Sequence, residues 1–67
     1  MKIEARIKEA HIPIDETTAK LALIVEYRKA DSKSGWMFHS IYTDECLARY
    51  VKESIESGDI QVLVMNQ

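Results

Sequence analysis

Residues 20–28 read Lys-Leu-Ala-Leu-Ile-Val-Glu-Tyr-Arg, and this stretch decides the fold. The β-branched and aromatic residues favour an extended conformation. Alternate positions point to opposite faces of a strand, and both rows here are largely apolar. One row holds Leu21, Leu23, Val25 and Tyr27, and the other holds Ala22 and Ile24. A strand that is apolar on both faces is typical of the centre of a sheet, so residues 20–28 are predicted to be a central strand.

Two further strands are predicted around this one. In residues 2–8, Ile3, Ala5 and Ile7 alternate with charged residues, a pattern typical of a half-buried strand. Residues 36–42 read Trp-Met-Phe-His-Ser-Ile-Tyr and follow a polar loop over residues 29–35. Strict alternation would place Trp36, Phe38 and Tyr42 on one face, with Met37, His39 and Ile41 on the other. Pro13 lacks a backbone donor, so residues 9–19 are predicted to form a loop, with a short extended piece at His11–Ile14 as an open alternative.

A helix is expected between the third strand and a fourth. Thr43 is the predicted N-cap and Gly58 the predicted C-cap of the helix. Apolar side chains recur at helical spacing between these ends, at Leu47, Tyr50, Val51 and Ile55. Residues 60–65 alternate again and are predicted to be the last strand. The expected fold class is therefore α+β, a four-stranded, mostly antiparallel sheet in the order β-β-β-α-β with one helix packed on one face. Strand order 3-2-1-4 is expected, and pairing of the last strand next to the third remains open.

Chain length and net charge limit the number of domains and the classes of function that fit this sequence. The 67 residues form one small domain, residues 1–67, and the formal net charge is -2. This charge disfavours a nucleic-acid binder, which normally carries a basic excess. Cys46 is the single cysteine, and no stretch is long and apolar enough for a membrane span. A reducing, cytoplasmic location is expected.

One helix can cover only one face of such a sheet, so the other face is a candidate interaction surface. The helix is expected to cover Ile3, Ile7, Leu21, Leu23, Val25, Phe38, Ile60, Val62 and Val64. The opposite face would then carry Ala22, Ile24, Met37, Ile41, Leu63 and Met65. An apolar centre with a polar rim is how interaction surfaces are built. Alternatively, the loop over residues 9–19 folds across this face and completes the core.

The residues predicted to bind a partner are Ile24, Met37, Ile41, Leu63, Met65 and Trp36, together with Glu53 and Glu56 on an acidic helix face. The expected partner is another protein, including a second copy of the chain in a homodimer. A chain this small and free of motifs also suits an inhibitor of a host complex encoded by a phage or mobile element. The alternative function is binding of single-stranded nucleic acid through the aromatic third strand, Trp36 and Phe38.

Catalysis has weak support in the sequence. Cys46 lies near the expected helix start and could form a nucleophilic pair with His39. The chain lacks a glycine-rich phosphate loop, and His11, His39 and Cys46 have no metal-site spacing. We therefore predict no enzyme activity, no cofactor and no metal.

Overall fold

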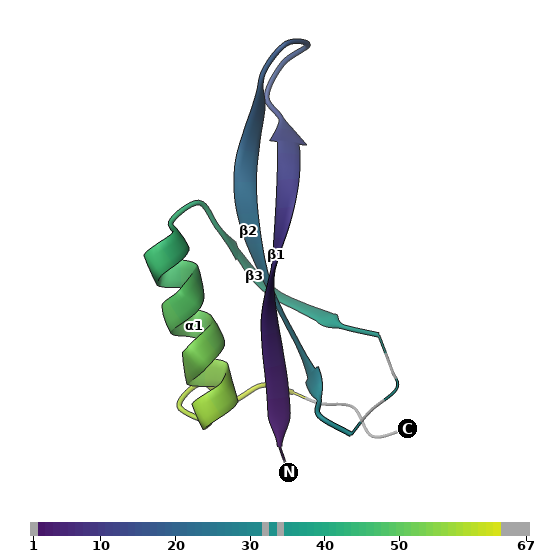
Figure 1. Cartoon of the computed structure of the whole chain (residues 1–67), viewed down its shortest axis with the longest axis vertical. Coiled ribbons are helices and arrows are strands. Elements are labelled where there is room, and N and C mark those ends of the chain that lie inside the picture. The colour runs from purple at the N-terminus through teal and green to yellow at the C-terminus, as the bar shows by residue number, and fades with distance from the viewer. Residues whose placement is uncertain (1, 32, 34, 64–67) are drawn as a thin grey trace.

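The computed structural model describes residues 2–31, 33 and 35–63. Three strands, β1 (Ile3–Pro13), β2 (Ala19–Lys29) and β3 (Met37–Tyr42), precede one helix, α1 (Glu45–Ser57). The strands form an antiparallel sheet in the order β1-β2-β3, and α1 packs on one face of it (Figure 1). The α+β class is confirmed. The predicted central strand is indeed the middle strand β2.

The β1–β2 hairpin is longer than predicted and projects beyond the helix as a two-stranded arm (Figure 1). We call residues 11–20 the arm, and every one of them is exposed. The prediction of a loop over residues 9–19 is wrong for most of this range, because β1 continues to Pro13 and the turn is confined to residues 14–18. The extended piece considered at His11–Ile14 agrees with the end of β1. The arm also does not fold over the sheet, so that alternative is wrong too.

Pro13 fits in β1 because of the hydrogen-bond pattern of the hairpin. The amide of Ala30 donates to the carbonyl of Lys2 at 3.0 Å, and the amide of Ile14 donates to the carbonyl of Thr18 at 2.9 Å. Residues of an antiparallel pair point their backbone groups alternately toward and away from the neighbour. Even-numbered residues of β1 therefore point toward β2, and odd-numbered ones point outward. Pro13 is at an outward position, where its missing N–H removes no hydrogen bond between the strands.

A β-bulge between β2 and β3 changes which side chains of β3 face the helix. Ser40 lies opposite Val25, but the next residue of β2, Glu26, lies opposite Phe38, so His39 is the extra residue. Because opposed residues share a face, Met37 lies on the helix side and Phe38 on the other side. The prediction had these two reversed, since it assumed strict alternation through His39.

The core lies between α1 and one face of the sheet. Its most buried residues are Ala5, Leu23, Val25, Tyr27, Ala48, Val51 and Ile55. The predicted helix stripe is partly wrong: Val51 and Ile55 are buried, but Leu47 is 45% and Tyr50 65% exposed. The helix instead turns Ala48 and Ser54 toward the sheet. Leu21 was also expected beneath the helix, and it is exposed in the described structure.

Both ends of the helix are capped by local chemistry. Asp44, one residue after the predicted Thr43, is the N-cap, and its carboxylate accepts the amides of Cys46 and Leu47. Gly58 is the C-cap, as predicted, with φ of 91°. This left-handed conformation favours glycine, which has no Cβ.

The fourth strand is not seen among the described residues. Residues 60–63 have no strand pairing; the remainder of the predicted strand, Val64 and Met65, lies outside the described residues. The segment instead runs along the helix side of the sheet, where Ile60 and Val62 pack against the core. The hydroxyl of Tyr27 donates to the carbonyl of Leu63 at 2.8 Å. This segment therefore adds to the core without extending the sheet, and the expected order 3-2-1-4 is wrong.

Candidate functional site

The face of the sheet away from α1, which we call the open face, carries two different surfaces. It contains the even-numbered residues of β1 and β2 together with Phe38 and Ile41 of β3, as the cross-strand pairing fixes. Charged side chains occupy the half near the chain start. The half that continues into the arm is largely apolar, with Lys8 and Lys20 as its charged residues.

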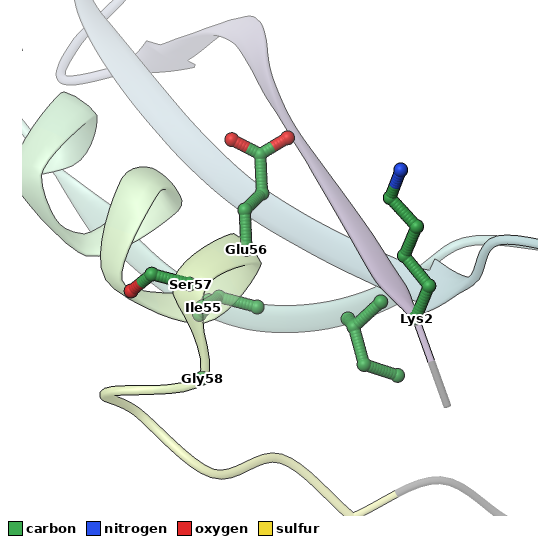
Figure 2. A pocket seen from close by; sticks show the side chains of 6 residues that line it. Lys2, Ile55, Glu56, Ser57 and Gly58 are labelled. Atoms are coloured by element: carbon green, nitrogen blue, oxygen red, sulfur yellow. The ribbon is translucent and has the colours of Figure 1, made fainter.

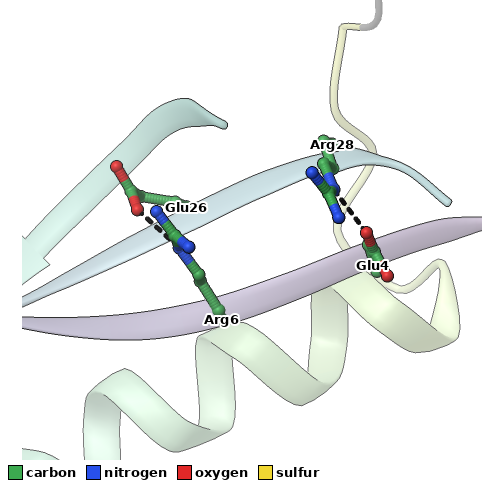
Figure 3. A network of polar contacts seen from close by, with 4 residues as sticks. All are labelled: Glu4, Arg6, Glu26 and Arg28. Carbon is green, nitrogen blue, oxygen red and sulfur yellow. Dashed lines mark hydrogen bonds and ion pairs between the residues drawn. The ribbon is translucent and has the colours of Figure 1, made fainter. Parts of the chain in front are cut away.

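The charged half is a ladder of two cross-strand ion pairs (Figure 3). Arg6 lies opposite Glu26, and its Nε is 2.8 Å from a carboxylate oxygen of Glu26. Glu4 lies opposite Arg28 and forms the second pair. These four charges cancel, which leaves Lys2 as the remaining charged residue of this half. Both strands read acid, any residue, base, and antiparallel pairing of two such segments necessarily aligns opposite charges. This pattern is present in the sequence, but the predicted open face did not include these ion pairs.

Trp36 completes the ladder. The guanidinium carbons of Arg6 and Arg28 each lie 4.4 Å from the centre of its ring system. Contacts of this kind between a cation and an aromatic ring are attractive. Trp36 is half-buried, and its ring is already in contact with two side chains of its own sheet. Stacking of a nucleic-acid base there would have to displace at least one arginine.

The apolar side chains of this second half follow one another along the sheet, with Lys8 and Lys20 beside them and Ala22 buried among them. Opposed pairs run from the arm toward the bulge: Ala10 with Ala22, Lys8 with Ile24, and Ile24 with Ile41. Phe38 is the next open-face residue of β3 after Ile41. Phe38 is 61% and Ile41 45% exposed. We call Ile12, Ala10, Ala22, Ile24, Ile41 and Phe38 the apolar stripe.

The predicted partner-binding residues do not all lie together. Ile24 and Ile41 belong to the stripe, and Trp36 borders it at the charged half. Met37 packs against the core on the helix side, so its predicted position on the open face is wrong. Leu63 is 80% exposed, but its carbonyl lies against Tyr27 on the helix side, so it is not on the open face either. Met65 lies outside the described residues.

The acidic helix face is a separate surface. Glu53 and Glu56 are both exposed on α1, but Glu56 is paired with Lys52, whose Nζ lies 2.9 Å from its carboxylate. Arg49 and Glu45 form a similar pair at 2.7 Å. Because two basic residues lie among the acids and neutralise part of their charge, the helix is less acidic than its Glu and Asp content suggests.

A shallow hollow lies between the start of β1 and the end of α1 (Figure 2). It has a volume of about 370 Å³ and is lined by Lys2, Ile3, Ile55, Glu56, Ser57 and Gly58. A second hollow of about 240 Å³ adjoins it, since Ile3, Ile55 and Gly58 line both. Lys2 and Glu56 are the charged residues in the lining of the larger hollow. Sequence reasoning did not find this site, because its lining residues are far apart in the chain.

Cys46 and His39, the candidate catalytic pair, share no hydrogen bond in the described part of the chain. The Nδ1 of His39 is 2.7 Å from the Ser40 hydroxyl, and its ring lies edge-on to Tyr27. Cys46 is an exposed free cysteine at the helix start. Within residues 2–31, 33 and 35–63, no group of three or more His, Cys, Asp or Glu side chains could hold a metal ion.

The tip of the arm has one perturbed carboxylate. Hydrogen bonds from the backbone of Thr17, and then from the Thr17 hydroxyl and Thr18, hold the pKa of Asp15 below its usual value of 3.8. The amides of Thr17 and Thr18 lie 2.9 Å and 2.8 Å from the same carboxylate oxygen. The charged form of Asp15 therefore stabilises the turn, which is a structural role.

In the described part of the chain, α1 is too short and too polar to cross a membrane. Comparison with family models, curated proteins and solved structures gives no match to this chain.

Proposed function

We propose that this chain is a non-catalytic protein-binding module that associates through the apolar stripe of its open face, with a second copy of itself as one partner. The observation that carries the proposal is the exposure of Phe38 and Ile41 on a sheet face that no described segment covers. Exposed apolar side chains that adjoin one another, beside a polar rim, are typical of interaction sites.

The charged ladder supports self-association in particular. The pairs Glu4–Arg28 and Arg6–Glu26 neutralise four charges on the open face, which lowers the repulsion between two copies that approach face to face. Lys2, Lys8 and Lys20 keep some positive charge on that face. The small size of the chain also favours self-association. A domain of 67 residues has a small core, and burial of more apolar surface by association would stabilise it. The role of an inhibitor encoded by a phage or mobile element remains a prediction, as does the cytoplasmic location.

The test is a matched pair of substitutions, Ile41→Lys and Leu47→Lys. Both side chains are 45% exposed, but Ile41 lies on the stripe and Leu47 on the helix. Sedimentation equilibrium over a wide concentration range should show that Ile41→Lys lowers the average mass and that Leu47→Lys does not. Circular dichroism establishes that both variants remain folded.

Two results would count against the proposal. If the unsubstituted chain is a monomer at millimolar concentration, self-association fails. The wider proposal then depends on capture of a protein partner that is lost with Ile41→Lys and kept with Leu47→Lys. If both substitutions weaken association or capture equally, the stripe is not the contact.

A further inference from the structure

The outer edge of β1 is a row of backbone groups that no described strand pairs with. Because even-numbered residues of β1 bond to β2, the N–H and C=O groups of Ile3, Ala5, Ile7, Glu9 and His11 point outward. Such a row can accept an additional strand. Pro13 offers no outward N–H, so it ends the row at the arm.

The two edges of the sheet differ in their suitability for strand addition. β3 spans only Met37–Tyr42, and the bulge at His39 interrupts the adjoining register. β1 pairs with β2 without interruption from Ile3 to Pro13, so its backbone is regular along its length. Bulges and prolines are devices that prevent strand pairing. Of these two devices, the edge of β1 has only Pro13 in the arm, and its segment Ile3–Ile7 has neither. The charged residues of this segment alternate with Ile3, Ala5 and Ile7 and therefore lie on the open face.

The helix side of this edge offers an apolar surface for the side chains of an added strand. Ile3, Ala5 and Ile7 face the helix, and α1 packs against β1 more extensively than against β2 or β3. The hollow lined by Ile3, Ile55 and Glu56 lies at the start of this segment (Figure 2). A strand added here could place an apolar side chain over Ile3 and into the hollow.

Charge at this edge specifies the kind of strand that fits. The open-face side of the segment carries Lys2, Glu4, Arg6 and Lys8. Glu4 and Arg6 are already paired with β2, whereas Lys2 and Lys8 have no ion-pair partner among the described residues. Opposite charges directly across a pair of strands attract. An added strand should therefore carry acidic residues opposite these two lysines.

We propose that the β1 edge binds an extended peptide segment of a partner protein as an additional antiparallel strand. The segment would have apolar residues opposite Ile3, Ala5 and Ile7, and acidic residues opposite Lys2 and Lys8. Main-chain hydrogen bonds supply affinity in this mode of recognition, and alternate side chains supply specificity. The inference goes beyond the proposed function, because it uses the edge of the sheet and not the apolar stripe.

The probe is a capped synthetic peptide, Glu-Val-Thr-Val-Thr-Val-Glu, which places its three valines opposite Ile7, Ala5 and Ile3. Titration into isotopically labelled protein should shift the amide signals of these three residues and protect them from hydrogen exchange. The amides of Glu4, Arg6 and Lys8 should already be protected without peptide, because they bond to β2. A peptide with lysine at both ends should bind about tenfold more weakly, since two attractive charge pairs become repulsive.

N-methylation provides a control matched in composition. A methyl group on the central valine nitrogen removes an N–H that points at β1 and should abolish binding. The same methyl on the preceding threonine nitrogen points away and should leave binding unchanged. The inference is wrong if the two methylated peptides bind equally, if no saturable binding occurs, or if the Ile3, Ala5 and Ile7 amides are protected before peptide is added.

The titration is repeated with the Ile41→Lys variant. Unchanged peptide binding by this variant places the peptide at the edge. Loss of binding would place the peptide on the apolar stripe, which overturns the edge inference while supporting the proposed function.

Discussion

Removal of the Tyr27 hydroxyl tests the main difference between the structure and the predicted fold. Tyr27 is 6% exposed, and its hydroxyl donates to the carbonyl of Leu63 at 2.8 Å. This bond ties the segment after α1 to β2 on the helix side of the sheet. If these residues formed a fourth strand in the sheet, a hydrogen bond between the Tyr27 hydroxyl and the Leu63 carbonyl would not be expected.

The magnitude follows from a single hydrogen bond. Tyr27→Phe keeps the ring in the core and removes one bond, which is worth about 1 kcal/mol in folded proteins. The carbonyl that loses its donor belongs to Leu63, which is 80% exposed, so water can replace the hydroxyl and keep the cost from rising further. For a domain of this size, about 1 kcal/mol lowers the melting temperature by roughly 4–8 °C.

Tyr50→Phe is the matched control. It makes the same chemical change at a tyrosine that is 65% exposed and whose hydroxyl has no hydrogen-bond partner among the described residues. Urea unfolding followed by circular dichroism, at one fixed protein concentration, gives both changes in unfolding free energy. Equal stability of the two variants would refute the docking of residues 60–63 against Tyr27. A loss above about 3 kcal/mol would exceed one hydrogen bond and would also contradict this reasoning.

Two further predictions concern the helix end and the arm. Gly58→Ala should cost about 1 kcal/mol in the same unfolding assay, because φ of 91° is strained for any residue with a Cβ. Gly35→Ala is the control and should leave the free energy of unfolding unchanged. A Cβ at either glycine meets no atom within 4 Å, but only Gly58 has a positive φ among the described residues. Equal losses of stability in the two variants would refute the argument from φ. Because folding lowers the pKa of Asp15 from 3.8, its contribution to the turn is complete above that pH and is lost as pH falls through the folded pKa. The Thr17 and Thr18 amide signals should therefore shift with a midpoint below pH 3.8, and a midpoint at or above 3.8 would contradict the hydrogen bonds to Asp15.

Local patterns predicted the parts of the fold that depend on local chemistry. Residues 20–28 became β2 because both of their faces are apolar, and Gly58 became the C-cap because only glycine suits the left-handed conformation. The alternation of Ile60 and Val62 was equally clear, but alternation requires only that one side of an extended chain be buried. It does not specify whether the backbone bonds to a strand, so a docked segment and a strand look alike in sequence.

The candidate surface was predicted less well, because it depends on pairing between strands. The residues from Trp36 to Tyr42 offer little contrast between polar and apolar positions, so nothing local indicates the extra residue at His39. A β3 strand without the bulge would have Met37 on the open face and Phe38 on the helix side. The predicted surface therefore contained Met37 in place of Phe38. The loop prediction around Pro13 was wrong for a related reason. A proline interrupts a strand only at a position whose N–H would bond to the neighbouring strand, and this depends on the register with β2.

The part of the apolar stripe that lies outside the arm is too small to form a stable interface alone. A stable interface buries about 800 Å² on each partner, whereas even a fully buried aromatic side chain contributes only about 150–250 Å². Phe38, Ile41 and Ile24 therefore supply too little area, and the charged ladder around Trp36 adds a rim rather than an apolar centre. The arm end of the stripe adds further area, because Ile12 of the stripe lies on the arm and Ile14 at the tip of the arm is 61% exposed. Tight association through the open face should accordingly require the arm, and Ile12→Lys should weaken it along with Ile41→Lys.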